Sequence, residues 1–407
     1  MEIGICRSSL KTILHLDMNS YFATAEQQAN PCLRGRPVGI IKAPGRGCVI
    51  ASSIEAKKFG VKTGATAWRA KELCPEIILV PADMDKYFSL TKKMITIVEN
   101  YSPTVEVFSI DEVFADVTET QNLFSGGVVE MVYRIKEDIF LDLGEWIKCS
   151  AGVSFSKLIA KLASEMNKPN GLTFLNTDNY LQETADIGVE KVCGIGSSRM
   201  KYLHDRGLFT LGMARKVDLP LEIHDLVWLL EDENLVTKDD LFPAKSVSRT
   251  YTTFEDLRSE KEVEVLIRNL SEEVAEKLRE MGMAGRTLGL FVRSEIGSKS
   301  VRKTLKDPTN DGMVIFEMLW REYLTNSLLP VRFAGVSVSN LVWEGQMFIL
   351  EEVRKRNMVL KSVDKVNDKW GQFTIYPAIF LENELIRPEV TGFLGDKWYR
   401  FGGRKRT

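Results

Sequence analysis

The sequence predicts a multidomain α+β protein, and three observations support this prediction. The chain has 407 residues, too many for one ordinary hydrophobic core, so two to four domains are expected. Hydrophobic residues make up 44% and charged residues 27%, the balance of a globular protein in water. Short runs of β-branched and aromatic residues alternate with longer amphipathic segments, which favours sheets covered by helices.

Composition excludes several other classes of protein. No apolar stretch approaches the roughly 18 residues of a membrane span, and the first six residues lack the layout of a secretion signal. We therefore expect a cytoplasmic protein. The six cysteines form no CxxC pair and there are three histidines, so no zinc site is predicted and buried, reduced thiols are expected. A net charge of −2 still permits a local basic surface for nucleic acid.

Strands and helices alternate along the first 175 residues. Strand propensity and helix-breaking glycines and prolines set their bounds. The predicted elements are a strand ending at Asp17, a helix capped by Asn19 or Ser20 and running to 29, a strand at 37–41, helices at 53–59 and 84–100, a hairpin at 105–116, a helix at 127–142, a strand at 147–153 and a helix at 156–167. We interpret them as a mainly antiparallel sheet with helices on one face.

The remainder of the chain changes character twice. Residues 176–240 have a pattern of short helices, and 241–245 has the composition of a linker. A second α+β domain follows, with strands predicted at 246–253, 287–294, 298–305 and 333–341 and helices near 260–282 and 310–326. Beyond residue 342 the composition is mixed, and the chain closes on a basic tail.

Three carboxylates are predicted to meet at the ends of neighbouring strands. Ser109-Ile110-Asp111-Glu112 forms an acidic tip between two apolar runs, and Asp17 ends an earlier apolar run. Adjacent acids repel each other unless a cation lies between them, and oxygen ligands of this kind suit Mg²⁺. Two such ions clamp an in-line phosphoryl displacement. An acidic turn alone is usually a solvated hairpin tip. Catalysis is favoured here because the acids occur together with the glycine and lysine segments described next.

Lysines and glycines supply the predicted phosphate contacts. The proline and Asn-Gly that follow Lys168 fix a sharp turn, so Lys168 projects from a rigid corner. Lys157 and Lys161 are instead expected on the solvated side of a helix. Gly194 and Gly196 precede a helix, where backbone N–H groups approach a phosphate in a helix-hairpin-helix.

One strand of the second domain also suits phosphates. Alternation along 298–305 places four polar side chains on one face, namely Ser298, Ser300, Arg302 and Thr304. A strand face exposed to solvent explains this pattern equally well.

Five motifs occur in a fixed order along the chain. They are Leu16–Ala23, Glu55–Gly64, Ser109–Glu112, Gly152–Lys157 through Lys168–Gly171, and Gly194–Gly196. Together they resemble the Y-family translesion DNA polymerases, the DinB/UmuC group, and the resemblance spans residue 11 to about 342. It implies a right-hand-like polymerase with a palm (1–22 and 80–175), small fingers (23–79), a helical thumb (176–240), a little finger (246–342) and a C-terminal extension (343–407).

The resemblance implies roles for the acids. Asp17 and Asp111 would bridge two Mg²⁺ ions, for which Mn²⁺ can substitute. Glu112 would hold the ion that activates the primer 3′-hydroxyl, and the Met18 carbonyl would complete the coordination of the nucleotide-side ion. This assignment fits the chemistry, because two cations lower the pKa of the hydroxyl and neutralise charge on the α-phosphate.

The resemblance also implies how the nucleotide is held. Tyr21 and Phe22 would offer backbone N–H groups to the triphosphate, and Lys57 and Lys168 match phosphate-binding positions. Phe22 matches the steric gate, whose ring would collide with a ribose 2′-hydroxyl; an ordinary core aromatic is the alternative. 

The chain departs from the family at three positions. Ala51 and Ile54 stand where many members carry a threonine and a tyrosine for the triphosphate, and Asn19 replaces the second acid of the first motif. The Ala51 pattern favours the UmuC-like branch and leaves open how the outer phosphates are held.

A short peptide follows the predicted little finger. Gln346-Met347-Phe348-Ile349-Leu350 resembles the glutamine-to-hydrophobic peptide with which such enzymes dock on the bacterial sliding clamp, while a buried amphipathic strand is the alternative. Residues 352–407 lie outside the motif matches, and they include a segment, 365–371, that would cap the little finger or bind a partner.

The expected function is template-directed, low-fidelity DNA synthesis past damaged bases, without proofreading. The resemblance implies primer-template DNA and dNTPs as substrates, a place in the SOS response to DNA damage, and a cytoplasmic, nucleoid-associated location. Two alternatives are a catalytically silent DNA-binding scaffold and a nucleotide cyclase built on a palm. Retention of all three acids opposes the first, and the predicted thumb hairpin and little-finger strands have no purpose in the second.

Overall fold

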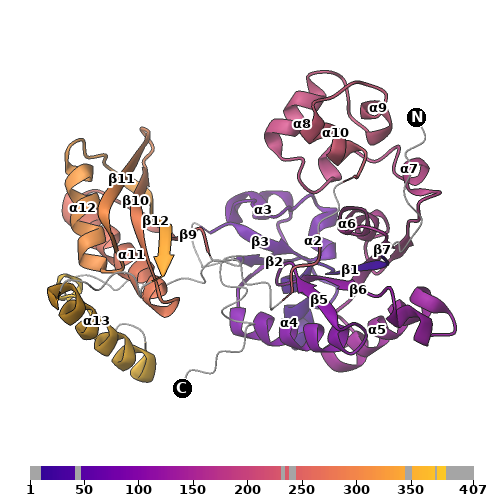
Figure 1. Cartoon of the computed structure of the whole chain (residues 1–407), viewed down its shortest axis with the longest axis horizontal. Coiled ribbons are helices and arrows are strands. Elements are labelled where there is room, and N and C mark those ends of the chain that lie inside the picture. The colour runs from indigo at the N-terminus through magenta and orange to yellow at the C-terminus, as the bar shows by residue number, and fades with distance from the viewer. Residues whose placement is uncertain are drawn as a thin grey trace. The chain divides into compact units, whose positions relative to one another are not determined.

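Two compact units make up the part of the chain that the computed structural model describes, which is residues 11–41, 47–230, 234–237, 244–343, 351–371 and 374–381 (Figure 1). Unit 1 holds the described residues up to 237, and unit 2 holds those from 244 onward. Within these ranges, no helix has both the length and the apolar character needed to cross a lipid bilayer.

Unit 1 contains two sheets. The larger has the strand order β5-β6-β1-β7-β8 and the smaller β3-β2-β4. Their strands are β1 (Ile13–Met18), β2 (Val38–Ile41), β3 (Val49–Ser52), β4 (Ile78–Pro81), β5 (Thr104–Val107), β6 (Glu112–Asp116), β7 (Cys149–Ser154) and β8 (Leu172–Phe174). The helices are α1 (Tyr21–Ala29), α2 (Ile54–Lys58), α3 (Ala67–Leu73), α4 (Met84–Glu99), α5 (Gly127–Leu143), α6 (Lys157–Met166), α7 (Tyr180–Glu183), α8 (Ser197–His204), α9 (Leu211–Ala214) and α10 (Leu221–Val227).

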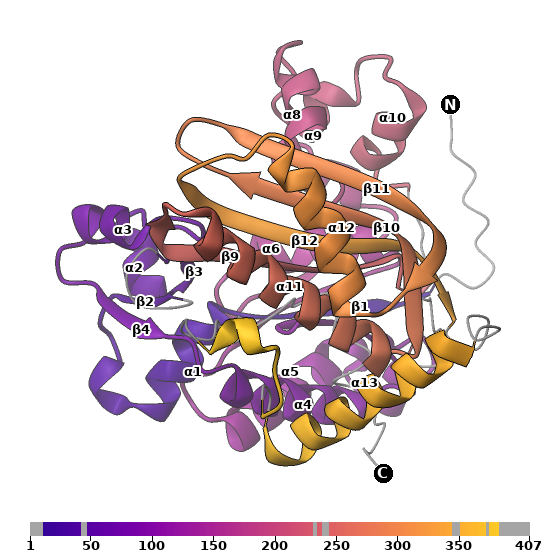
Figure 2. The same cartoon turned by 90° about the vertical axis from the view of Figure 1, so that its left-hand side faces the viewer.

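The predicted elements of unit 1 are present to within a few residues, but the expected layering is wrong. Helix α6 lies on one side of the larger sheet and helices α4 and α5 lie on the other, as both views show (Figures 1 and 2). Strand β1 explains the difference, because Ile13, Leu14 and Leu16 are all buried although successive side chains point to opposite faces. A strand buried on both faces needs cover on both.

Helix α6 approaches the sheet very closely at Gly152 of β7. A Cβ atom at this position would lie 2.0 Å from the carbonyl oxygen of Ala160 and 2.4 Å from the backbone nitrogen of Ser164. Only hydrogen fits between the two backbones. The same helix contributes Leu158, Ile159 and Leu162 to a second hydrophobic core that it shares with α7–α10.

Unit 2 is a four-stranded antiparallel sheet, in the order β11-β10-β12-β9, with helices α11 and α12 packed on one face. Its elements are β9 (Ser246–Leu257), α11 (Glu260–Glu280), β10 (Met283–Arg293), β11 (Ser298–Thr309), α12 (Gly312–Leu324), β12 (Val331–Trp343) and α13 (Glu351–Trp370). Helix α11 begins with a reciprocal capping box between Ser259 and Glu262. Arg279 of α11 pairs with both carboxylate oxygens of Asp364 on α13, at 2.6 and 2.7 Å.

Two smaller expectations need correction. The helix α1 follows Ser20, but neither Asn19 nor Ser20 caps it with its side chain, since Ser20 has a left-handed backbone and makes no such bond. The five described cysteines are free, and they are not all buried: Cys74 and Cys149 are, whereas Cys32, Cys48 and Cys193 are exposed.

Substitution of Gly152 by alanine tests the close contact between β7 and α6. We expect Gly152→Ala to lower the free energy of unfolding by about 2 kcal/mol or more, because neither neighbouring backbone can move away. The matched control is Gly196→Ala, where no atom lies within 4 Å of the added Cβ, so a change within about 0.5 kcal/mol is expected. Urea unfolding measures both, and equal midpoints for the two variants would contradict the close approach.

Candidate active site

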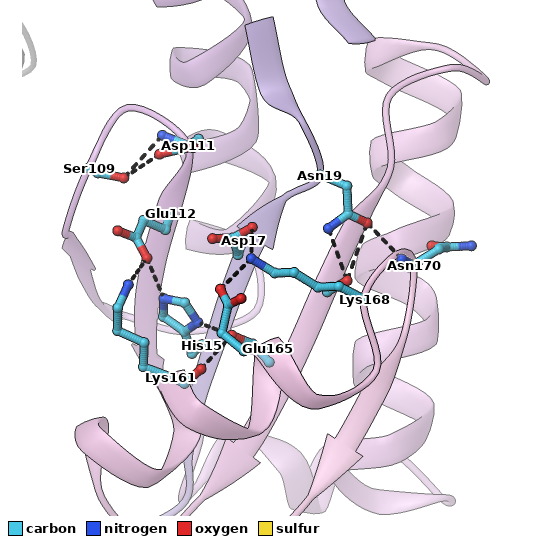
Figure 3. A network of polar contacts seen from close by, with 12 residues as sticks. His15, Asp17, Asn19, Ser109, Asp111, Glu112, Lys161, Glu165, Lys168 and Asn170 are labelled. Atoms are coloured by element: carbon cyan, nitrogen blue, oxygen red, sulfur yellow. Dashed lines mark hydrogen bonds and ion pairs between the residues drawn. The ribbon is translucent and has the colours of Figure 1, made fainter. Parts of the chain in front are cut away.

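Two of the three predicted acids, Asp17 and Glu112, lie on adjacent strands of the larger sheet in unit 1, and Asp111 directly precedes the second strand. Asp17 of β1 and Glu112 of β6 are register partners. The Met18 N–H donates to the Asp111 carbonyl at 2.9 Å, which holds the acidic tip against the end of β1. The prediction that Asp17 and the Asp111–Glu112 corner come together is therefore met in the backbone (Figure 3).

Asp17 is buried beside a lysine. The Nζ atom of Lys168 lies 2.7 Å from Asp17 Oδ1, and it also pairs with Glu165 (Figure 3). Burial raises the pKa of Asp17 to about 7, since the charges of Asp111 and Glu112 add to the burial effect and Lys168 offsets only part of it. The sequence predicted Lys168 at a rigid corner, but not its pairing with an acid of the site.

Glu112 is held by two side chains, one cationic and one neutral. Its Oε2 atom lies 3.0 Å from His15 Nε2 and pairs with the ammonium of Lys161. Burial alone would raise the pKa of Glu112, but these hydrogen bonds and the Lys161 charge outweigh it and lower the pKa to about 2. Full burial lowers the pKa of His15 to about 4, so the imidazole is neutral at pH 7.

Two lysines on α6 correct the prediction of a solvated helix side. Lys161 reaches Glu112, as described above, and Lys157 forms an ion pair with Glu106 of β5 at 2.7 Å. Both partners of the second pair are more than nine-tenths buried. Glu106 also accepts the Val236 N–H at 2.9 Å, so this pair fastens the segment after α10 to the sheet. The prediction was wrong because helical periodicity carries no information on partners far away in the sequence.

Asp111 completes the group. Its Oδ1 atom accepts a hydrogen bond from the Ser109 hydroxyl. Burial raises the pKa of Asp111; the Ser109 hydrogen bond acts in the opposite direction, and the Glu112 charge raises it further. Two of the three acids are thus buried with their negative charge incompletely balanced by the protein.

This donor set fits divalent cations in its chemistry. Three carboxylates at adjacent strand ends are the hard oxygen ligands that Mg²⁺ prefers, and uncompensated buried charge is what a cation would stabilise. The side chains are not gathered as a finished ligand set: among the described residues, no three histidine, cysteine or acidic side chains stand ready around one ion. The Asp17 carboxylate pairs with Lys168, and the Glu112 carboxylate contacts His15 and Lys161 (Figure 3). Both carboxylates therefore already contact basic side chains of the protein.

The two aromatic residues after β1 pack against helix α4. The ring of Phe22 stacks on that of Tyr87, with centroids 4.4 Å apart and an interplanar angle of 16°. The Tyr21 hydroxyl lies 2.7 Å from the Tyr87 carbonyl oxygen and 2.9 Å from Thr91 Oγ1. Thr91 in turn contacts the Ile110 carbonyl oxygen at 2.6 Å, which connects α4 to the acidic tip. Sequence reasoning missed Tyr87, which lies outside the five motifs.

Lys57 lies in the neighbourhood of this site, on α2. Partial burial and the positive charge of Lys168 lower its pKa, while Asp17 and Asp111 raise it, so these four groups share one electrostatic environment. Ala51 belongs to β3 and Ile54 begins α2. Neither side chain carries a hydroxyl, and the Ser53 hydroxyl between them is used to cap α2 through the Ala56 N–H.

A polar groove runs across the face of the unit 2 sheet that α11 and α12 leave open. Its volume is about 610 Å³, and alternate residues of all four strands line it, including Ser248 on β9, Gly289 on β10, Arg302 on β11 and Ser337 on β12. These four form one row across the sheet through the strand registers. Ser300 and Arg302 line the groove, as the alternation along 298–305 predicted.

The glycine motif of unit 1 also has the predicted geometry. Gly194 has φ of +97°, and Gly196 precedes helix α8 directly. A turn at Gly207, with φ of +72°, then leads from α8 toward α9.

The predicted clamp peptide, Gln346–Leu350, lies outside the described residues.

Comparisons with known proteins agree with this architecture. The model of the impB/mucB/samB family matches residues 16–165, and the model of the impB/mucB/samB family C-terminal domain matches residues 244–349. A Y-family DNA polymerase chimera of Dbh and Dpo4 has the same fold, with a TM-score of 0.69 over 82% of this chain and 99% of the chimera, at 22% identity.

Curated relatives extend over nearly the whole chain. The DNA polymerase IV of Acetivibrio thermocellus is 30% identical over 394 residues, which cover 92% of this chain and 98% of the relative. The DNA polymerase IV of Lactococcus lactis subsp. cremoris is 32% identical over 355 residues, which cover 83% of this chain and 96% of the relative. The DNA polymerase IV of Pelotomaculum thermopropionicum is 32% identical over 390 residues, which cover 91% of this chain and 95% of the relative.

The fold and the site define a polymerase of the Y-family type. The chain belongs to the impB/mucB/samB family, the Y-family DNA polymerases, and its relatives indicate the DinB type. The preference for the UmuC-like branch, which rested on Ala51, finds no support among these relatives.

Proposed function

We propose that the chain is a template-directed, low-fidelity DNA polymerase without proofreading, which carries out translesion synthesis at the acids of unit 1. Family membership and DNA polymerase IV relatives support the activity. The observation that carries the assignment of the site is the register pairing of Asp17 with Glu112, with Asp111 bonded to the end of the same strand. Substrates are primer-template DNA and dNTPs, and the reaction depends on a divalent metal.

The residues proposed to hold two Mg²⁺ ions are Asp17, Asp111, Glu112 and the Met18 carbonyl, with Mn²⁺ as a substitute. When bound there, the ions lower the pKa of the primer 3′-hydroxyl and neutralise charge on the α-phosphate. Asp17 and Asp111 gain most from a cation, because burial already raises their pKa values. Glu112 is ionised throughout the neutral range, held by His15 and Lys161.

Lys168 and Lys57 are proposed to bind the triphosphate. Lys168 pairs with Asp17, and a triphosphate would offer its ammonium a stronger partner. The backbone N–H groups of Tyr21 and Phe22 contribute further hydrogen bonds at the start of α1. The missing hydroxyls at Ala51 and Ile54 leave a larger share of this task to the two lysines.

Phe22 is proposed to be the steric gate. Its ring is held in place by the stack on Tyr87, and the Tyr87 hydroxyl donates to Glu26 Oε1 at 2.8 Å. A ring that cannot retreat excludes a ribose 2′-hydroxyl by collision, which costs more than a lost contact because both partners are rigid.

Domain assignments follow from these roles. The larger sheet is proposed as palm (1–22 and 80–175), the smaller sheet with α2 and α3 as fingers (23–79), α7–α10 as thumb (176–240) and the unit 2 sheet as little finger (246–342). The groove of serines, glycines and Arg302 and the N–H groups near Gly196 are proposed to hold the DNA backbone.

Two further parts of the proposal rest on sequence alone. Gln346, Met347, Phe348, Ile349 and Leu350 are proposed to dock on the sliding clamp. A cytoplasmic, nucleoid-associated location and a place in the SOS response are proposed from the family resemblance.

Removal of one carboxylate tests the metal site. Asp111→Asn should reduce primer extension on the order of a thousandfold, the equivalent of the several kcal/mol that bound metals supply in the transition state. Primer-template affinity should stay unchanged, because it depends on the groove and the thumb. Single-turnover extension and fluorescence anisotropy measure the two quantities. Extension that survives both Asp111→Asn and Glu112→Gln would refute the assignment of the acids.

Removal of the Phe22 ring tests the proposed steric gate. Phe22→Ala should raise ribonucleotide insertion relative to deoxynucleotide insertion by about tenfold or more, because the collision with the 2′-hydroxyl is relieved. Phe22→Tyr keeps the ring and serves as the control, with selection expected to stay as in the wild type. Insertion of rNTP and dNTP opposite the same template base gives the ratio, and unchanged sugar selection in Phe22→Ala would remove this role.

Deletion of residues 346–350 tests the clamp peptide. Extension in the presence of the clamp should fall to the clamp-free rate, while clamp-free extension stays as in the full chain. The measurement is processive extension on a circular primed template with and without loaded clamp. Stimulation that persists after deletion would exclude the peptide.

A further inference from the structure

We propose that Asn19 and Lys136 are positioning residues, which fix the backbone of the turn that carries Lys168 and thereby set the affinity for the incoming nucleotide. This turn, the lysine turn, consists of Lys168, Pro169, Asn170 and Gly171. The inference rests on the function proposed above for Lys168 and adds two residues to it, neither of which has been assigned a role so far.

Asn19 connects the lysine turn to the sheet. Its Oδ1 atom accepts the Asn170 N–H at 2.6 Å, and its Nδ2 group donates to Ser150 Oγ at 3.0 Å (Figure 3). Its own N–H donates to the Lys148 carbonyl at 2.8 Å. The side chain is 4% exposed, so these hydrogen bonds have no competition from bulk water and their loss is expensive.

Lys136 holds the lysine turn from the side of α5. Its Nζ atom donates to the Asn170 carbonyl at 2.6 Å and to the Gly171 carbonyl at 3.1 Å. Both backbone groups of Asn170 are thus bonded to side chains that come from other elements. An ammonium shared between two carbonyl oxygens makes charge-assisted bonds, which are stronger than neutral ones.

The lysine turn has little freedom of its own. Asn170 has φ of +57°, a left-handed conformation that needs support from its surroundings. At Gly171, a Cβ atom would lie 1.9 Å from the Asn167 carbonyl oxygen. Asn19 and Lys136 supply the support, and without either of them the turn can relax to another conformation.

The backbone of this turn matters because the Lys168 side chain is flexible. Four carbons and a point charge do not define a direction by themselves, yet the Lys168 ammonium lies 2.7 Å from Asp17, at the acids. A turn that relaxes carries this ammonium away from the phosphates. The consequence falls on binding of the nucleotide rather than on the chemical step.

The choice of asparagine at position 19 fits this role. An amide accepts from the Asn170 N–H and donates to Ser150 at the same time, and it adds no charge beside Asp17. A carboxylate would keep the first hydrogen bond, and it could accept a hydrogen bond from the Ser150 hydroxyl, which already lies 3.2 Å from Asn19 Oδ1. Asn19→Asp is therefore the conservative variant, and Asn19→Ala removes both contacts.

Steady-state insertion of a single dNTP on a primed template tests the inference. Asn19→Ala and Lys136→Met should each raise KM for dNTP about tenfold, as expected for about 1.4 kcal/mol of lost binding, with kcat changed less than about twofold. Asn19→Asp should keep KM within about threefold of the wild type. In a Lys168→Ala background, neither substitution should raise KM further, because the residue they position is gone.

Each contrary result has a distinct meaning. Additive effects of Asn19→Ala and Lys168→Ala on KM would overturn the positioning role and leave Lys168 as a phosphate ligand. A Lys168→Ala variant with unchanged KM would overturn the proposed function of that lysine itself. A raised Mg²⁺ requirement in Asn19→Ala, at unchanged KM, would assign Asn19 to the metal site instead.

A variant that fails to fold does not decide the test. Thermal unfolding and primer-template affinity are measured on the same preparations. Lys136 lies on α5, and methionine keeps most of the apolar length of the lysine side chain, so Lys136→Met can decide alone if Asn19→Ala is unstable. An unchanged KM in well-folded Lys136→Met would overturn the inference for that residue.

Discussion

The central position of strand β1 determines where every functional group of unit 1 lies. This strand pairs with β6 on one side, which places Asp17 opposite Glu112, and with β7 on the other, which places Asp17 opposite Ser150. A slip of one residue in either register would turn Asp17 to the other face of the sheet. Burial of Leu14 and Leu16 on one face and of Ile13 and His15 on the other makes such a slip expensive, so the hydrophobic core also fixes the geometry of the acids.

The same burial creates an electrostatic imbalance at the acids. Glu112 has two basic partners and a lowered pKa, whereas Asp17 and Asp111 have raised pKa values in spite of Lys168 and Ser109. Replacement of such groups by apolar residues would be expected to stabilise the fold, because the attraction between buried charges often does not offset their free energy of desolvation. The imbalance is reasonable where divalent cations bind. Of the partners that the protein itself supplies, Lys168 and Lys161 contribute the positive charge beside these acids.

The secondary structure and the proximity of the acids were predictable from sequence, and the reasons are local. Asp17 and the Asp111–Glu112 tip each end a run of strand-forming residues, so strand ends and acids coincide. The layering was not predictable, because a short apolar run does not reveal how many helices cover it. The partners of Lys157 and Lys161 were missed for a similar reason. Helical periodicity assigns a face, but only tertiary structure shows that Glu106 and Glu112 lie opposite that face.

Asn19 shows a different limit of sequence reasoning. Its position in the first motif identified it as a departure from the family, and its neighbours suggested a helix cap. The structure instead directs its side chain across the sheet to Asn170, 151 residues later. No local pattern predicts a hydrogen bond of this kind, because it depends on two loops that the fold brings together.

The groove of unit 2 suits the proposed binding of damaged templates, because its lining is polar and independent of sequence. Serine hydroxyls, glycine backbone and Arg302 line it, and Val247, Leu288 and Val338 on intervening positions belong to the core. Hydroxyl and guanidinium groups bind phosphates irrespective of the base. At Gly289 a Cβ would lie 2.5 Å from the Ser337 hydroxyl, so any larger residue there would displace that side chain. In the function proposed above, a surface of short polar groups would hold the backbone of DNA and make few demands on the shape of the bases.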